Sequence, residues 1–385
     1  MKTRLLYVIV GSLFALLVFA GIHTYLEIQA NSRPVDIFVG VDAAYDNMES
    51  LKKRVDEVKS YTNFFIIGSY GITFNETKLN DLCQYIYDSG LSFAIFSHTT
   101  RDSNIPFNQS EWAYYAEDRW GERFWGLYAY DEPGGHQVDH DSEFMAVKEA
   151  DNYSDAANKF IAKLSGDALL DFIPLNSPLM TSDYALYEFD YKAGYDTILA
   201  ELAWNHSRPI NIALCRGAAT VRGKEWGVML TYTYDTPPYL ASGVQIYDDL
   251  VRAYQNGAKY FIVFDYAKDP ATNVTHGILQ QEHLNALQQF WQYVKHNPRT
   301  TEISERVAYV LPKDYAYGFR GPNDSIWGLW GPDDLSTTVW NEANTLTNQY
   351  GPALDIVYED SLQKSAFNYS RLVFWNGTTS TNHSP

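Results

Sequence analysis

Short apolar runs and helical stripes alternate along the chain from residue 34 onward. The runs have the length of buried strands, and several are rich in β-branched and aromatic residues. A repeated order of strand, helix, strand predicts a parallel α/β architecture, because a helix carries the chain back across the sheet before the next strand. The eight expected strands span residues 35–41, 63–68, 91–97, 124–130, 185–190, 210–215, 226–232 and 259–265.

Between these runs, apolar residues recur every three or four positions, which is typical of helices with one buried face. Eight such strands within residues 34–297 match the ~250 residues of a (β/α)8 TIM barrel. The fifth and sixth strands are the weakest, since residues 169–174 compete for the fifth place and little room is left for a helix after the sixth. The clearest stripes are Leu51, Val55, Val58; Leu79, Leu82, Cys83, Ile86; Ile246, Leu250, Tyr254; and Leu284, Leu287, Trp291, Val294.

A smaller pattern of the same kind follows Pro298. Residues 304–376 predict a small flavodoxin-like parallel α/β domain, and residues 377–385, rich in Ser, Thr and Asn, are expected to form a disordered tail. The expected strands of this small domain are 306–311, 354–358 and 371–375, and its expected helices are 336–350 and 361–367.

Residues 1–30 have the features of a signal anchor or a cleaved signal peptide. Lys2 and Arg4 precede an uncharged apolar run from Leu5 to Ile22, and residues 18–20 could form a cleavage site. Because basic residues stay on the cytoplasmic side, the chain is expected to be a single-pass cell-membrane protein with its barrel outside, or a secreted one if the leader is cleaved.

Nine N-x-[ST] sequons agree with an external location, since this tripeptide is the acceptor for N-glycosylation. Cys83 and Cys215 are the only cysteines, and both fall at expected core positions. Free buried thiols are the favoured interpretation, with a disulfide as the alternative. The sequons begin at Asn75, Asn108, Asn152, Asn205, Asn273, Asn323, Asn368, Asn376 and Asn382.

The charge balance narrows the possible partners. The chain carries 47 acidic and 29 basic residues, a net charge of −18, which disfavours nucleic acid and anionic lipid surfaces. A carbohydrate remains compatible, and the 16% of aromatic residues suit sugar rings. No phosphate-binding glycine loop, dinucleotide fingerprint or metal-ligand spacing is visible, so neither a cofactor nor a metal is expected.

The octapeptide YAYDEPGG, residues 128–135, places Asp131 and Glu132 where an apolar strand stops. Pro133 and the two glycines prevent the strand from continuing. In a TIM barrel the carboxyl ends of the strands form the active face. Other polar residues expected at strand ends, as substrate-binding candidates, are Asp42, His98, Glu188, Arg216, Tyr232, Tyr234, Tyr266 and Lys268.

Two carboxylates flanking a glycosidic bond, one a proton donor and one a nucleophile or base, would explain so many polar strand ends. Glu132 is the expected general acid. Asp265 is the first choice for its partner, because it ends the eighth strand and is followed by Tyr266 and Lys268. The alternative is a structural network of salt bridges through Arg216 and Lys268.

This layout resembles the retaining barrel glycoside hydrolases of family 42, the β-galactosidases. Their fourth-strand acid/base glutamate would correspond to Glu132, but residues 226–235, WGVMLTYTYD, offer no glutamate for the nucleophile, only Asp235. The Asp-Glu-Pro motif is similar to that of the family 20 and 123 hexosaminidases. That resemblance implies that Asp131 orients the substrate's acetamido group, Glu132 is the acid, and Tyr232 or Tyr234 holds the acetamido oxygen.

The sequence therefore predicts an extracellular glycoside-hydrolase-like barrel acting on a glycan, by a retaining, inverting or substrate-assisted mechanism. The alternative is a non-catalytic carbohydrate-binding or cell-envelope barrel, which the missing seventh-strand glutamate would favour.

Overall fold

The structure is a computed structural model of the 385-residue chain. It describes residues 36–97, 106–139, 143–169, 172, 176–266, 277–299, 305–364 and 368–381. The predicted signal anchor or signal peptide, residues 1–30, lies outside this part of the chain. Within the described residues, no helix has both the length and the apolar character needed to cross a membrane.

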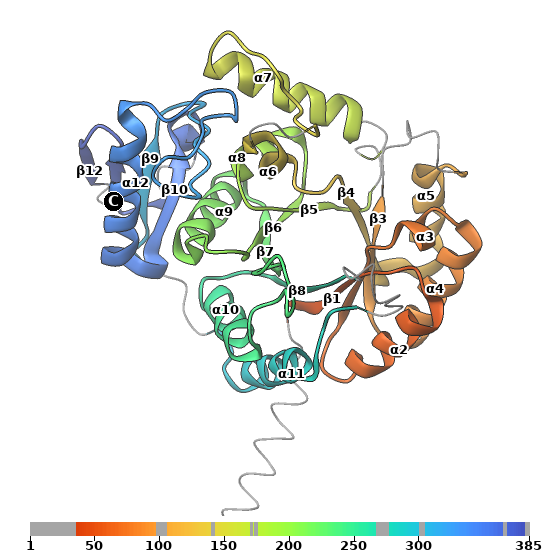
Figure 1. Cartoon of the computed structure of the whole chain (residues 1–385). Coiled ribbons are helices and arrows are strands. Elements are labelled where there is room, and N and C mark those ends of the chain that lie inside the picture. The colour runs from red at the N-terminus through yellow and green to blue at the C-terminus, as the bar shows by residue number, and fades with distance from the viewer. Residues whose placement is uncertain are drawn as a thin grey trace, which may run out of the picture.

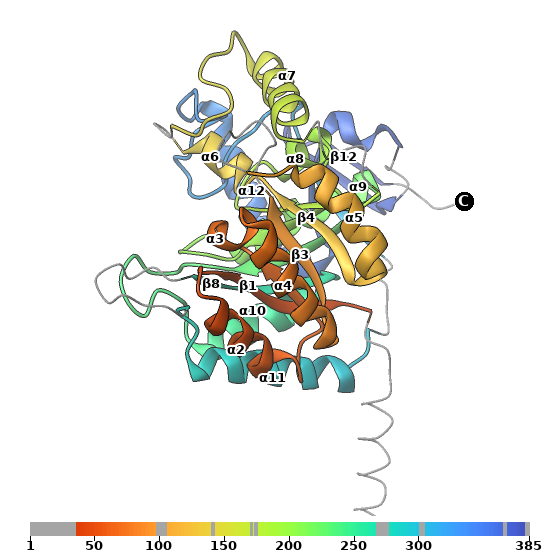
Figure 2. The same ribbon diagram turned by 90° about the vertical axis from the view of Figure 1, so that its right-hand side faces the viewer.

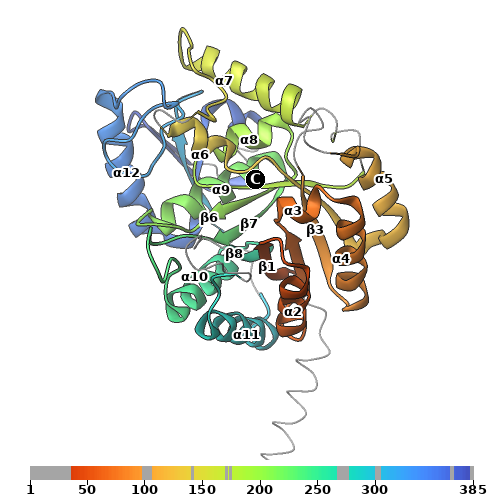
Figure 3. The same ribbon diagram turned by 45° about the vertical axis from the view of Figure 1, so that its right-hand side comes forward.

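Eight parallel strands close into a barrel, with each strand paired to its neighbours in sequence and β8 paired back to β1 (Figures 1 and 3). The predicted TIM barrel is confirmed. The strands are β1 (Phe38–Ala44), β2 (Phe64–Ile67), β3 (Ser92–Ser97), β4 (Phe124–Ala129), β5 (Leu179–Asp183), β6 (Thr197–Glu201), β7 (Glu225–Leu230) and β8 (Tyr260–Tyr266).

Helices surround the barrel, and the four predicted stripes lie on α2, α4, α10 and α11 with their apolar residues buried. Asparagine side chains cap the first turns of several helices, as Asn75 does by accepting the backbone N–H of Lys78. The helices are α2 (Met48–Val58), α3 (Tyr70–Thr73), α4 (Glu76–Asp88), α5 (Gln109–Trp120), α6 (Pro133–Val138), α7 (Tyr153–Lys163), α8 (Tyr187–Ala193), α9 (Arg208–Arg222), α10 (Gly243–Gln255) and α11 (Gln281–His296).

The predicted fifth and sixth strands are wrong. Residues 187–190 and 210–215 belong to α8 and α9, and residues 185–186 directly precede α8, whereas β5 and β6 lie at 179–183 and 197–201. Both helices are buried on almost every side, because they pack between the barrel and the C-terminal sheet. In α8 the buried residues Glu188 and Asp190 alternate with aromatic ones, so its sequence has the two-residue period of a strand.

The barrel interior follows the two-residue alternation of strand side chains. Near the amino-terminal ends of the strands the interior is aromatic and includes Trp125, whose indole N–H donates to the hydroxyl of Tyr260 at 3.1 Å. On β1, β5 and β6 the same inward phase continues to Asp42, Ser182 and Glu201 at the carboxyl ends of the strands. Polar residues therefore replace apolar ones where the interior opens.

A second sheet of four strands follows the barrel, in the order β10-β9-β11-β12. Its first three strands are parallel, as predicted, but β12 pairs antiparallel with β11, so the sheet is mixed. Residues 379–381 of the predicted disordered tail form this added strand. The elements are β9 (Val307–Leu311), α12 (Asp334–Tyr350), β10 (Leu354–Tyr358), β11 (Arg371–Phe374) and β12 (Thr379–Thr381), with a 3-10 helix at Glu359–Lys364 in place of the expected helix at 361–367.

The small sheet packs against α9 and α8, far from α2 and α4 (Figure 1). Together with α6, α7 and α8, its elements occupy the upper half of Figure 2, above α2, α10 and α11. A buried ion pair joins the two parts, since Nε of Arg216 on α9 lies 2.6 Å from Oδ1 of Asp355 on β10. The two parts also approach closely at Gly217, where any Cβ would collide with the carbonyl oxygen of Ile356.

Candidate active site

A cavity of about 950 Å³ opens at the carboxyl ends of the barrel strands. Residues in or just after all eight strands line it, including Asp42, Asp131, Glu132, Ser182 and Glu201. This is the face on which TIM-barrel proteins carry their functional groups. Its walls also include the aromatic side chains Phe96, Tyr128, Tyr184, Trp204, Tyr232, Phe264 and Tyr266.

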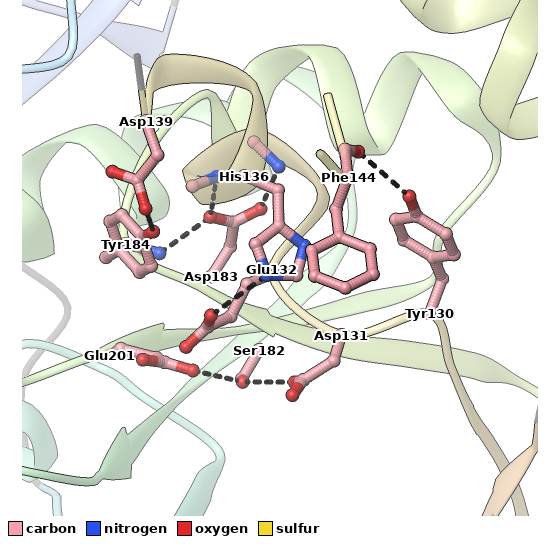
Figure 4. Close-up of polar contacts among 12 residues, drawn as sticks. Tyr130, Asp131, Glu132, His136, Asp139, Phe144, Ser182, Asp183, Tyr184 and Glu201 are labelled. Atoms are coloured by element: carbon pink, nitrogen blue, oxygen red, sulfur yellow. Dashed lines mark hydrogen bonds and ion pairs between the residues drawn. The ribbon is translucent and has the colours of Figure 1, made fainter. Parts of the chain in front are cut away.

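A strained turn presents Glu132 to this cavity. Glu132 adopts a left-handed conformation, with φ 47° and ψ 47°, which is rare for a residue with a side chain. Its backbone N–H donates to the carbonyl of Ser182 at 3.1 Å. Directly after it, the short helix α6 begins, and the buried carboxylate of Asp183 accepts the N–H groups of Gly134 and Gly135 at 2.5 and 2.7 Å (Figure 4).

The two glycines of the DEPGG motif are explained by crowding behind this turn. A Cβ on Gly134 would lie 2.5 Å from the carbonyl oxygen of Ala185, and one on Gly135 would enter the ring of Tyr184. Asp183 also accepts the N–H of Tyr184 and of Ala185, at 2.7 and 3.1 Å. The motif therefore fastens the turn that carries Asp131 and Glu132 to the end of β5.

Glu201, at the end of β6, is the second carboxylate of the cavity, and its carboxyl group lies next to that of Glu132 (Figure 4). The Ser182 hydroxyl lies 2.5 Å from Oε1 of Glu201 and 3.5 Å from Oδ1 of Asp131, so these two carboxyl groups are within about 6 Å of each other. Tyr128 donates its hydroxyl to Asp131 and lies 2.8 Å from Ser182.

Burial and mutual repulsion set the protonation of this group. Burial, followed by the charges of Glu201 and Asp131, raises the pKa of Glu132 well above its ordinary value. Burial and the charge of Asp131 raise the pKa of Glu201 to about 8, although the Ser182 hydroxyl lowers it in part. Burial raises the pKa of Asp131 too, while the Tyr128 hydroxyl opposes the rise. Acids in this state can hold protons near neutral pH.

His136 is the basic group next to these acids. Its Nε2 lies 3.6 Å from Oε2 of Glu132, and its ring lies 5.3 Å from that of Phe144. Burial lowers the pKa of His136, so the imidazole is neutral near pH 7 and does not neutralise Glu132.

Asp42 lies in β1, across the barrel from β4, β5 and β6. Its side chain is 2% exposed, and Oδ1 has no hydrogen-bond partner among the described residues. Burial, then the charges of Asp131, Asp265 and Glu201, raise the pKa of Asp42 well above its ordinary value. The expected position of Asp42 in the cavity wall is thus observed.

Asp265 is not in the cavity wall. It follows Phe264 in β8 and therefore points to the opposite side, toward the helices. There Oδ2 accepts from Nε of Arg54 at 3.0 Å, and Oδ1 accepts the N–H of Leu279 at 3.0 Å. A carboxylate enclosed in this way has no free face for a sugar, which makes it a poor candidate for the partner of Glu132.

Glu188 and Arg216 also lie elsewhere, because they belong to α8 and α9 rather than to strand ends. Glu188 forms ion pairs with Arg222 and Lys192, and Arg216 faces Asp355 of the small sheet. Both are buried structural contacts on the outer side of the barrel.

The remaining predicted residues divide into three groups. Tyr232 and Tyr266 line the cavity, as predicted. Tyr234 and Asp235 are exposed beyond β7, and neither belongs to the cavity wall. His98 and Lys268 lie outside the described residues.

Glu201, Ser182 and Asp183 were missed because their strands were placed elsewhere in the sequence. A signal was present: Gly194 ends a helix, and the apolar run 197–200 then leads to Glu201 and a loop. Within the described chain, no group of three or more His, Cys, Asp or Glu side chains is arranged to hold a metal ion. Both cysteines are free and buried, as favoured.

No family model matches the chain, and no curated protein matches it in sequence. Among solved structures, it is similar to a GH5_18 protein from Streptomyces cattleya, with 11% identity and a TM-score of 0.52 over 89% of this chain and 99% of that one. Two weaker neighbours are an endo-1,4-β-mannanase from Rhizomucor miehei and a xylanase from Cellvibrio japonicus. The mannanase has 9% identity and a TM-score of 0.43 over 68% of this chain and 95% of its own. The xylanase has 10% identity and a TM-score of 0.39 over 67% of this chain and 98% of its own.

At 11% identity, the likeness to the first of these structural neighbours shows the fold alone. They do not support the narrower resemblance to family 42 or to families 20 and 123. The match to the first neighbour covers more of the chain than the barrel occupies, so it extends into the C-terminal sheet.

Proposed function

We propose that this protein is a glycoside hydrolase that acts on a glycan through Glu132 and Glu201. The observation that carries the proposal is the pair itself: the buried carboxyl group of Glu201 and the partly exposed one of Glu132 lie side by side in a large cavity, at the carboxyl ends of β6 and β4. Hydrolysis of a glycosidic bond needs one protonated and one ionised carboxyl group on either side of that bond.

Glu132 is proposed as the general acid. Its burial and the neighbouring negative charges favour its protonated form, and the neutral His136 does not remove that proton. A glutamic acid in such surroundings can protonate the leaving oxygen near neutral pH. In the second half of the reaction the same group, now ionised, would accept a proton from water.

Glu201 is proposed as the nucleophile or base, in the place first expected for Asp265. Ser182 donates to one of its oxygens, and its Oε2 has no hydrogen-bond partner among the described residues. Because Glu201 lines the cavity, this oxygen without a partner is the one proposed to meet an anomeric carbon or a water molecule. The anomeric configuration of the first product, read by NMR, distinguishes the two roles.

A substrate-assisted reaction is the second candidate, because Asp131 also lines the cavity beside Glu132. In that case Asp131 would orient a 2-acetamido group, and hydrolysis would require this group. The Streptomyces cattleya structure was solved in complex with GlcNAc, a 2-acetamido sugar. Glycosides of GlcNAc are therefore the first substrates to compare with their 2-hydroxy counterparts.

The experiment is hydrolysis of a panel of aryl glycosides by the wild-type protein and the variants Glu132→Gln, Glu201→Gln and Asp235→Asn. We expect each glutamine variant to lose at least ~100-fold in kcat/KM on the best substrate, because each lacks one of the two proton-transfer or bond-forming groups. The exposed Asp235→Asn control should keep full activity. Binding of sugars without hydrolysis of any of them would instead favour the carbohydrate-binding barrel.

An external location is proposed with this function. All seven sequon asparagines within the described residues are exposed, so glycans could be attached without disturbing the core. Protease added to the extracellular side of the membrane in sealed vesicles should digest the barrel. Digestion only from the cytoplasmic side would contradict this orientation.

A further inference from the structure

Asp42 is a buried carboxylate that the two-glutamate reaction does not use. It lines the cavity and is 2% exposed, and Oδ1 has no hydrogen-bond partner in the described structure. An unsatisfied buried carboxylate oxygen reduces the stability of a fold unless something supplies a donor. Here the open side is the cavity, so the donor can come from a ligand.

Oδ1 of Asp42 is itself buried against Gly68, whereas the residue as a whole lines the cavity, so a ligand meets the carboxylate from the cavity side. Gly68, at the end of β2, also lines the cavity, and any Cβ at this position would collide with Oδ1 of Asp42. The β2 end therefore leaves room for the carboxylate where a larger residue would displace it. The charges of Asp131 and Glu201 act on Asp42, which places it within electrostatic reach of the catalytic pair.

The described cavity wall has one sign of charge. Asp42, Asp46, Asp131, Glu132, Asp139 and Glu201 line it, and no described lining residue is lysine or arginine. A sugar that carries a carboxylate or sulfate would be repelled by these groups and would find no cationic partner among them. A sugar with hydroxyl or ammonium donors would be attracted.

We propose that Asp42 is a specificity-determining residue that accepts a hydrogen bond from a hydroxyl or ammonium group of the bound sugar, so that the cavity takes neutral or amino sugars and rejects acidic ones. This inference rests on the proposed function, because it concerns the same cavity. It adds the chemical class of the substrate and the group that recognises it.

The test is direct binding, which needs no turnover. Methyl glycosides of the gluco, galacto and manno series, each as the neutral, 2-amino, 2-acetamido and uronic acid form, are titrated by calorimetry or saturation-transfer NMR. In at least one series, the neutral or amino forms should bind the wild-type protein at least ~10-fold more tightly than the uronic acid. Asp42→Ala should weaken that binding ~10-fold or more, the scale of a hydrogen bond to a charged group.

Asp235→Asn is the matched control, since Asp235 is exposed and does not belong to the cavity wall. It removes the same charge and should leave binding unchanged. Asp42→Asn keeps the size and one acceptor oxygen, so it should weaken binding of the amino sugar more than that of the neutral one. Both Asp42 variants should melt no lower than the wild type, because they relieve a buried unpaired carboxylate.

Unchanged binding in Asp42→Ala, equal or tighter binding of uronic acids, or no binding of any neutral or amino form would overturn the inference. These outcomes are separate from those of the proposed function. A wild-type protein that binds such sugars through Asp42 but hydrolyses none would refute the glycosidase and leave the specificity intact. An active enzyme indifferent to Asp42→Ala would refute only the specificity.

Discussion

The carboxyl groups in and near the cavity differ in their burial, neighbouring charges and hydrogen-bond partners, and we base their proposed roles on these differences. Burial and two acidic neighbours raise the pKa of Glu132 well above its ordinary value. Burial and Asp131 raise the pKa of Glu201 to about 8, and the hydroxyl of Ser182 opposes this rise in part. Asp265, by contrast, is enclosed by Arg54 and a backbone N–H. The same residue type is thus an acid, a base or a structural anchor according to its partners.

A pH dependence of stability follows from Glu201. Folding raises its pKa from 4.5 to about 8, so the folded chain keeps a proton that the unfolded chain has released. The free energy of unfolding should therefore fall as pH rises from about 4.5 to about 8 and then level off. Glu201→Gln removes this contribution, so its stability relative to the wild type should increase across that range.

Urea unfolding midpoints measured at intervals from pH 4 to pH 9 would show this. Asp235→Asn is the control, since its exposed carboxyl should give a curve parallel to that of the wild type. If the Glu201→Gln and wild-type curves are also parallel, Glu201 titrates normally and our view of its surroundings is wrong.

At the scale of elements, the turn between β4 and α6 determines where Glu132 points. Asp183 on β5 receives four backbone N–H groups, two of them from the first turn of α6. This network lets Glu132 persist in its left-handed conformation, because the surrounding contacts outweigh the local strain. The site thus depends on contacts behind the turn as well as on the groups in the cavity.

Gly134→Ala tests this dependence. The added methyl group would lie 2.5 Å from the carbonyl oxygen of Ala185, so the helix must shift, and we expect a loss of about 1–3 kcal/mol in stability. Activity of the folded fraction should fall as well, since Glu132 moves with the helix. Gly331→Ala, where a Cβ meets nothing within 4 Å, should change stability by no more than about 0.5 kcal/mol. Equal effects of the two substitutions would contradict the crowding argument.

Six of the eight barrel strands could be predicted from short apolar runs, because these strands are buried on both faces. The helices with a clear apolar stripe could be predicted because their side chains divide into one buried and one exposed face. Helices α8 and α9 could not, since burial by the second sheet removes that division. The error then hid β6 and with it Glu201. Alternation along β8 already contained the correct answer for Asp265, because Phe264 and Asp265 must face opposite sides.

At the scale of the whole molecule, the C-terminal sheet supports the barrel from one side. Its loop reaches the cavity edge, where Arg320 pairs with Asp139 and donates to the carbonyl of Val138 at 3.0 Å, while Gln137 donates to the carbonyl of Trp327 at 2.8 Å. These contacts hold α6 at its C-terminal end. The second sheet therefore belongs to the architecture of the site.

Asp355→Asn should weaken the connection between the two parts. Asp355 is fully buried and accepts from Arg216, Arg306 and Tyr369, so its loss leaves Arg216 as a buried charge without its counterion. Breaking such a pair costs about 3–5 kcal/mol. Lys224→Ala, which removes an exposed pair with Asp196, should cost less than about 1 kcal/mol. Chemical denaturation measures both, and similar small losses would mean that the buried pair does not join the sheet to the barrel.

The most direct test of the central claim, that Glu132 is the general acid of a glycosidase, is the dependence of its variant on the leaving group. Glu132→Gln is compared with the wild type on an aryl glycoside with an acidic phenol and on an alkyl glycoside of the same sugar, through kcat/KM. Because an acidic phenol leaves without protonation, we predict a loss of at least ~100-fold on the alkyl glycoside and a much smaller one on the aryl glycoside. Equal losses on both substrates, or none on either, would contradict the assignment.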